Sequence, residues 1–142
     1  MKTILLAAAA MALPAVLAAC QNLDLRDEPE DFMGYQGDPR LGEPVGRICF
    51  TREISGFGET TQDTVIVEAG ANDSYLVKTF GRCADLEHAD SMALDQFGAS
   101  CLTEGDSIIP YDTAFGPDAV GLPPRGCMID EIYRWRPDRD AE

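Results

Sequence analysis

The chain has 142 residues, enough for one domain, and 45% of them are hydrophobic, which allows a core and argues against wholesale disorder. It holds 25 Asp and Glu against 11 Lys and Arg, and only Lys2 precedes Cys20, so 10 basic and 25 acidic groups remain from Cys20 onward, a formal charge of −15. Phosphate backbones and anionic lipid surfaces repel such a chain, so nucleic-acid binding is disfavoured and any membrane attachment needs another cause. The charge favours solubility or a basic partner.

Residues 1–19 are predicted to be a signal peptide. Lys2 gives a positive start, an apolar run follows from residue 4 to 19, and no acid occurs before Asp24. The run is short for a spanning helix, and Pro14 interrupts it. Because no second hydrophobic run near spanning length follows, we expect an exported protein without an internal transmembrane segment.

The end of this signal resembles the lipobox of bacterial lipoproteins. It reads Leu17-Ala18-Ala19-Cys20, which is leucine, two small residues and cysteine. The resemblance implies that the Cys20 thiol takes a diacylglyceryl group, that a peptidase cuts before Cys20, and that the new amino group is acylated. Several acyl chains anchor stably where one binds marginally. Gln21, in place of an aspartate, favours the periplasmic face of the outer membrane. The alternative is ordinary cleavage at Ala10-Met11-Ala12.

Residues 20–45 are acidic, contain three prolines and sustain no regular period, so we interpret them as a tether. Phe32, Met33 and Tyr35 are expected to dock onto the domain or, as the alternative, to contact another protein. The domain is expected to occupy residues 46–137, and residues 138–142 a frayed tail.

Short strand-like runs separated by turn residues fill the domain. We predict strands at 47–54, 63–69, 74–80, 92–94, 106–112 and 127–135, a hairpin around the turn at 70–73, a short helix near Ala84 to Ala89 and a long loop at 112–126. Pro110 should stop its strand or place it at an edge. In the last strand, Cys127, Ile129, Tyr133 and Trp135 are expected on one face. The fold predicted is mainly β, a small antiparallel sheet closed into a barrel or sandwich, with at most one or two short helices and two disulfides.

Four cysteines remain once Cys20 is assigned to lipid, an even number in an exported chain, and this indicates two disulfides. Four cysteines allow three connectivities. The pairing favoured is Cys83 with Cys101, which closes a loop around the segment of ambiguous structure, and Cys49 with Cys127, which ties the first predicted strand to the last; loop entropy gives about 3 kcal/mol for the short link and somewhat more for the long one. A zinc site is the competing interpretation, but zinc usually takes cysteines in close pairs, and none of these is closer than eighteen positions to the next.

No motif predicts a catalytic, cofactor-binding or metal-binding set. His88, the only histidine, lies among Glu87, Asp90 and Ser91, where a hydrolase triad can be imagined, but no serine sits in a nucleophile elbow. A surface histidine on an acidic turn is the preferred interpretation. Trp135 and Tyr133 are expected to close the sheet as core residues rather than to form a ligand platform.

Short patterns in the domain are similar to those of one family. "RICF", "SYLVKTFGRCADLEHADSMAL", "CLTEGDSII" and "CMIDEI", within residues 46–134, resemble an uncharacterised family of small proteobacterial envelope lipoproteins, defined only as a domain of unknown function. The resemblance implies a disulfide-linked secreted domain and carries no site residues. We therefore expect a non-enzymatic envelope lipoprotein that is a binding or structural module and contacts a protein or another envelope component. An inhibitor of a basic hydrolase such as lysozyme and an unrecognised envelope hydrolase are the alternatives.

Overall fold

A computed structural model describes residues 30–98, 100–112 and 125–139. The predicted signal peptide, the lipidation of Cys20 and most of the predicted loop at 112–126 lie outside the described residues. Within the described part, no helix is long and apolar enough to cross a membrane.

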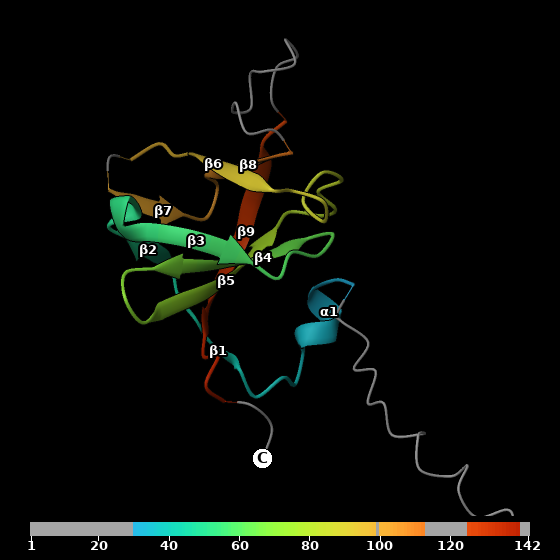
Figure 1. The fold of residues 1–142 in the computed structure, drawn as a ribbon, viewed down its shortest axis with the longest axis vertical. Coiled ribbons are helices and arrows are strands. Elements are labelled where there is room, and N and C mark those ends of the chain that lie inside the picture. The colour runs from blue at the N-terminus through green and yellow to red at the C-terminus, as the bar shows by residue number, and fades with distance from the viewer. Residues whose placement is uncertain (1–29, 99, 113–124, 140–142) are drawn as a thin grey trace, which may run out of the picture.

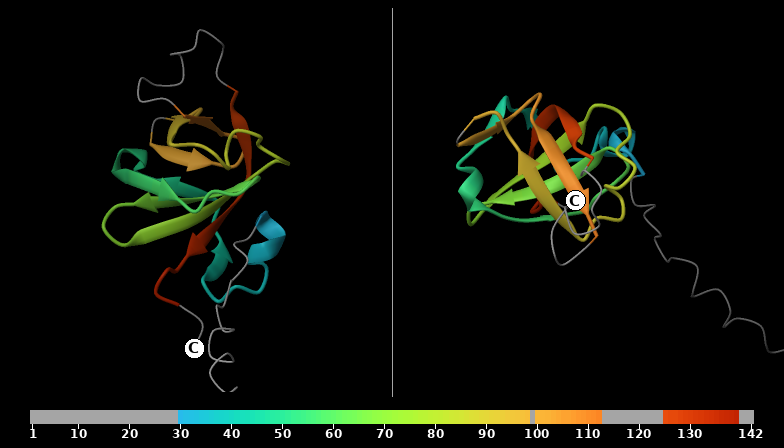
Figure 2. Two further views of the ribbon diagram at one scale, coloured as in Figure 1. Left: turned by 45° about the vertical axis from the view of Figure 1, so that its right-hand side comes forward. Right: turned by 90° about the horizontal axis from the view of Figure 1, so that it is seen from above.

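The protein is mainly β, as predicted, and its sheet curls into a nearly closed antiparallel barrel (Figure 1). The main sheet has the order β3-β4-β5-β9-β8-β6, with β1 paired to β9, and a separate pair is formed by β2 and β7. Seen from above in Figure 2, β6 and β8 lie over the hairpin of β4 and β5. The elements are α1 (Phe32–Tyr35), β1 (Leu41–Pro44), β2 (Arg47–Cys49), the 3-10 helix η1 (Thr51–Glu53), β3 (Ile54–Gly58), β4 (Thr64–Ala69), β5 (Asp73–Thr79), β6 (Ser91–Asp95), β7 (Cys101–Thr103), β8 (Ser107–Tyr111) and β9 (Cys127–Trp135).

The main core lies inside the barrel. β4 alternates between two apolar environments, because Val65 and Val67 point into this core while Ile66 points to the outer face of the sheet. Leu102 on β7 and Ile108 on β8 complete the same core, and both are fully buried. β4 is therefore buried on both faces. The barrel interior covers its inner face, and another part of the chain must cover its outer face.

The cover comes from the segment predicted to be a tether. Tyr35 on α1 is buried against Ile66, Leu76 and Trp135, and Phe32 packs onto the same cluster. β1 pairs with β9, so this segment also extends the sheet. The domain therefore includes residues from α1 onward, earlier than the predicted start at residue 46. Of the three side chains expected to dock, two do so and Met33 stays 66% exposed.

The faces of β9 differ from the prediction because the strand carries a bulge. Lys78 of β5 opposes Glu131 and the next residue, Thr79, opposes Ile129, so Asp130 is extra. One added residue reverses the alternation. Ile129 therefore lies in the main core, whereas Trp135 lies in the outer cluster, not on the same face as predicted.

Three other local predictions need correction. Residues 84–88 form turns instead of a helix, although Leu86 is buried in the core as a helical residue would be. The run at 47–54 is divided by η1 into β2 and β3. β8 is not an edge strand, since it lies between β6 and β9, but of its residues only Ser107 and Ile108 pair with β9. Pro110 thus lies beyond the part of β8 that pairs with β9.

All four cysteines of the domain form disulfides, as predicted, but the favoured pairing is wrong. The bonds are Cys49–Cys101 and Cys83–Cys127. Cys49 and Cys101 are direct partners in the β2–β7 pair, with their Cα atoms 4.0 Å apart. Cys83 follows β5 and Cys127 begins β9, and these strands are antiparallel neighbours. Strand pairing, which loop length does not predict, decides the connectivity.

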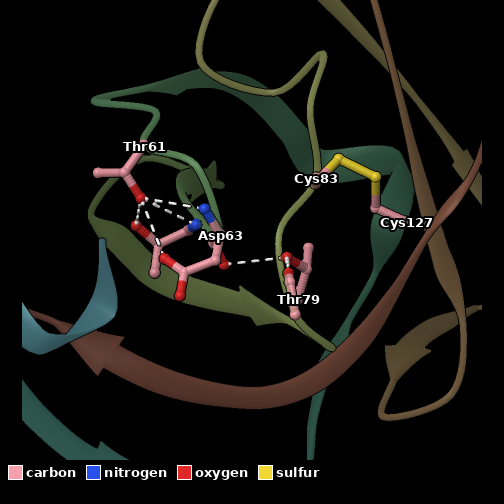
Figure 3. Close-up of a disulfide and its surroundings, with 7 residues drawn as sticks. Thr61, Asp63, Thr79, Cys83 and Cys127 are labelled. Atoms are coloured by element: carbon pink, nitrogen blue, oxygen red, sulfur yellow. Dashed lines mark hydrogen bonds between the residues drawn. A yellow bond between two sulfur atoms is a disulfide. The ribbon is translucent and has the colours of Figure 1, made fainter. Parts of the chain in front are cut away.

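The turn before β4 contacts both the N-terminal segment and the end of β5; Figure 3 shows its hydrogen bond to Thr79 and the neighbouring Cys83–Cys127 disulfide. The Asp63 carboxylate accepts a hydrogen bond from the Phe32 N–H at 2.8 Å, and the Asp63 carbonyl accepts one from the Thr79 N–H at 2.8 Å. The buried Thr61 hydroxyl lies 3.3 Å from the same carboxylate. The Cys83 N–H donates to the Gln62 carbonyl at 2.7 Å, so one turn holds α1, the end of β5 and the loop of Cys83 together.

Candidate binding site at the open seam of the barrel

The barrel does not close between β3 and β6, the two ends of the main sheet. Among the described residues, β3 pairs only with β4 and β6 only with β8. Both strands line a cavity of about 210 Å³, which we call the seam. Its lining is mostly apolar and consists of Thr51, Ile54, Ser55, Gly56, Phe57, Val67, Met92 and Leu94.

The sequence of β3, Ile-Ser-Gly-Phe-Gly, explains why the seam stays open. Its register with β4 shifts between Ile54 and Gly56, which leaves Ser55 as a bulged residue. Gly58 has no atom within 4 Å of the position where a side chain would begin. Glycines in a strand commonly mark a place where another backbone approaches closely. Few side chains of β3 are therefore available to fill the space towards β6.

Two exposed phenylalanines flank one end of the seam. Phe50 is 65% exposed and Phe97 is 96% exposed. They follow β2 and β6, and the side chains of their neighbours are joined, since the Gln96 amide donates to the Thr51 hydroxyl at 3.2 Å. The carbonyl oxygen of the same Gln96 amide is buried and has no hydrogen-bond partner in the described part of the chain.

Phe50 also has a strained backbone. Its φ of 62° lies in the left-handed region, which a bulky residue seldom adopts. Disulfide-bonded Cys49 precedes it, and the Thr51 N–H donates to the carbonyl of Ser100 at 3.3 Å, so both neighbours are held. The structure thus maintains an unfavourable conformation that presents an aromatic ring to solvent. Strain of this kind persists only where the surroundings impose it, and it is concentrated at functional sites.

Asp106 holds the other phenylalanine. Its carboxylate accepts hydrogen bonds from the Phe97 N–H at 2.9 Å, the Thr103 N–H at 2.7 Å and the Thr103 hydroxyl at 2.9 Å. Burial alone would raise the pKa of this carboxyl, but these hydrogen bonds outweigh it and leave the pKa lowered. A buried carboxylate therefore links the β7–β8 turn to the loop after β6.

The ends of both seam strands are acidic. Glu53 and Glu59 flank β3, Asp90 precedes β6, and Asp95 is its last residue. Of the four, only Glu59 has an ion-pair partner among the described residues, Arg40 at 3.9 Å. The two strands that line the apolar cavity therefore end in acidic residues, none of which lines the cavity itself, and the basic Arg52 of η1 precedes Glu53.

The sites considered from sequence lie elsewhere. His88 is exposed in the turn at 84–88 and makes no hydrogen bond to a serine among the described residues. Trp135 is buried, as expected for a residue that closes a sheet, and Tyr133 stacks on Phe32 with ring centroids 5.3 Å apart. No group of three metal-ligating side chains occurs in the described ranges.

Two neighbouring carboxylates, those of Asp130 and Glu131, contact the same lysine, Lys78. The Lys78 ammonium lies 2.6 Å from Asp130 and 2.9 Å from Glu131, because the bulge places both acids opposite one residue of β5. The hydrogen bonds that the Lys78 ammonium donates to these carboxylates raise the pKa of Lys78. The arrangement is a partly exposed ion-pair cluster, with Lys78 also 5.2 Å from the ring centre of Phe32.

The seam was missed by sequence analysis, although signals for it exist. Two glycines in one short strand and an aromatic directly after Cys49 are both visible in the sequence. What the sequence does not show is that β3 and β6 become the two ends of one curled sheet.

Comparison with known proteins gives a family and no function. The chain matches the model of a family of unknown function, DUF6491, over residues 1–141. No curated protein and no solved structure matches the chain.

Proposed function

The chain belongs to the DUF6491 family, whose function is unknown, and from that premise we propose that it is a lipid-anchored cell-envelope protein whose domain binds a protein partner at the seam without catalysis. The lipid on Cys20 holds the protein at the periplasmic face of the outer membrane. Residues between Cys20 and α1 act as the tether.

The seam is the observation that carries the binding role. An exposed strand edge can pair with a strand of another chain, and most proteins therefore blunt or cover their edge strands. Here the two edges border an apolar cavity, and Phe50 and Phe97 stand exposed beside it. Aromatic side chains around a small apolar patch are typical of protein interfaces.

Binding at the seam is tested by photo-crosslinking in intact cells. A photoreactive residue placed at position 97 should give a discrete adduct, because Phe97 is exposed beside the seam. The same residue at position 33 is the control, since Met33 is 66% exposed on the segment that covers the outer face. Equal adducts at both positions, or none at 97, would contradict the proposal.

The lipid anchor is tested separately by replacing Cys20 with serine. The variant should move from the membrane fraction to the soluble periplasmic fraction, because it has no thiol to alkylate. A variant with Ser100 replaced by alanine should fractionate like the natural protein. If Cys20→Ser stays in the membrane fraction, the anchor is not the lipid.

Inhibition of a basic hydrolase is the second candidate, and the acidic charge of the chain favours it. A surface with a formal charge of −15 attracts cationic enzymes by electrostatic steering. Lysozyme activity should fall when the Cys20→Ser chain is added, and the effect should weaken with salt. Unchanged lysozyme activity would remove this candidate and leave the first one standing.

A further inference from the structure

We propose that the seam is a strand-addition site, which takes one extended segment of a partner protein in which apolar residues alternate with lysine or arginine. The segment pairs with the free edges of β3 and β6 and completes the barrel. This inference rests on the proposed binding function and names the chemistry of the partner.

The backbone supports strand addition. β3 and β6 have five residues each, and in the described part of the chain neither has a backbone partner beyond its one neighbouring strand. An extended segment offers N–H and C=O groups to both edges, which is how peptides add to exposed sheets. The bulge at Ser55 and the glycines at 56 and 58 reduce side-chain crowding along the β3 edge.

The cavity determines the inward side chains of the segment. Ile54, Phe57, Val67, Met92 and Leu94 give the seam an apolar lining. Alternate residues of an added strand point to one face, so every second residue enters this lining. Small or branched apolar residues suit a volume of about 210 Å³ that is shared by two or three side chains.

The charges determine the outward side chains. Glu53, Asp90 and Asp95 stand at the ends of the two strands without an ion-pair partner among the described residues. A basic segment gains from this field, and an acidic one is repelled. The same reasoning disfavours a second copy of this chain, which carries the same excess of acid.

The test uses the Cys20→Ser chain and synthetic peptides of about six residues, the length that spans such edges. The first peptide alternates valine and lysine, the second alternates valine and glutamate, and the third is the valine–lysine peptide with alternate backbone nitrogens methylated. Amide chemical shifts in NMR spectra report the site of binding.

The valine–lysine peptide should bind and shift amides of β3 and β6, whereas the valine–glutamate peptide should bind roughly tenfold more weakly or worse. Methylation of alternate nitrogens should abolish binding, because it removes every donor that faces one of the two edges and places methyl groups against that edge. Absence of binding by the first peptide, equal binding by the methylated peptide, or shifts confined to other strands would overturn the proposal.

A pair of charge variants sharpens the result. Asp95→Lys should weaken binding of the valine–lysine peptide several-fold, since it reverses a charge at the end of β6. Glu30→Lys makes the same change on the N-terminal segment beyond the outer face and should leave binding unchanged. Equal effects of the two variants would show that only the net charge matters, which contradicts a local site.

The outcome is separable from that of the proposed function. If position 97 crosslinks to a partner in cells while the valine–lysine peptide does not bind, strand addition is wrong and the binding role stands. If both fail, both are wrong. Sedimentation of the Cys20→Ser chain as a dimer, lost in Asp95→Lys, would assign the seam to self-association instead.

Discussion

Tyr35 meets Trp135 edge-on, with the ring centroids 5.5 Å apart and the ring planes at 90°. This contact joins a segment that the sequence presents as a tether to the last strand of the barrel. Arg40 belongs to the same segment as Tyr35, and its guanidinium lies 4.6 Å from the centre of the Trp135 ring. The outer face of the sheet therefore has a small core of its own, which the segment from α1 to β1 covers.

Tyr35→Ala should lower the free energy of unfolding by about 3 kcal/mol, because it removes a fully buried aromatic ring from a small cluster. Urea denaturation monitored by Trp135 fluorescence measures the change. Met33→Ala, two positions earlier and exposed, should stay within about 0.5 kcal/mol of the natural protein. A loss below about 1 kcal/mol for Tyr35→Ala would mean that the segment is not part of the fold.

Tyr35 should also make the protein sensitive to alkali. Burial, with a further contribution from the Glu59 carboxylate, raises the pKa of Tyr35 from 10.0 to about 12. The stability from neutral Tyr35 is therefore complete below pH 10 and is lost as the pH rises through about 12. The loss is about 3 kcal/mol by linkage.

The Tyr35→Phe variant isolates this effect, since the ring remains and the ionisable hydroxyl does not. Its unfolding free energy should fall less between pH 10 and 12 than that of the natural protein. Parallel pH profiles for the two proteins would show that the tyrosine hydroxyl ionises equally in the folded and unfolded states.

Asp106→Asn should cost about 1–3 kcal/mol, because a neutral amide cannot accept all three hydrogen bonds from Phe97 and Thr103. The lowered pKa of Asp106 means that its stabilisation is present above the ordinary value of 3.8 and is lost as the pH falls through the folded value. The variant should therefore lose less stability than the natural protein on acidification below pH 4. Asp95→Asn, an exposed change in the same region, should show neither effect.

Phe50→Asn should raise the unfolding free energy by about 1 kcal/mol, because asparagine tolerates the left-handed backbone at φ 62° better than phenylalanine. Little buried surface is lost, since Phe50 is exposed. Thermal unfolding provides the measurement, with Phe80→Asn as an exposed control that lies outside this region. A destabilised Phe50→Asn would show that the ring contributes packing that outweighs its backbone strain.

The disulfide pairing is directly measurable. Proteolysis without reduction should yield one linked peptide pair containing Cys49 and Cys101 and another containing Cys83 and Cys127. The bonds separate residues by 52 and 44 positions, so loop entropy predicts that removing either pair as a double serine variant costs about 4 kcal/mol. Recovery of the Cys83–Cys101 peptide would contradict the strand register.

Local sequence patterns predicted much of the fold. The alternation in residues 63–69 and 74–80 predicted the β4–β5 hairpin, and Val65 and Ile66 do point to opposite faces. An even number of cysteines predicted that all four are bonded. The single bulged residue at Asp130 escaped the same reasoning, because a shift of one position arises from the pairing of two strands and leaves no mark in the pattern of one.

The sequence by itself determined the mainly β class, the presence of two disulfides and the acidic charge, and it led us to expect a cell-envelope location from the lipobox at Cys20. These depend on composition and on the period of short runs, which are local properties. Only the tertiary structure decided which cysteines pair, that residues 32–44 cover the outer face, and that β3 and β6 border an open seam. Each of these depends on which distant strands become neighbours, and that choice is made by the packing of the whole sheet.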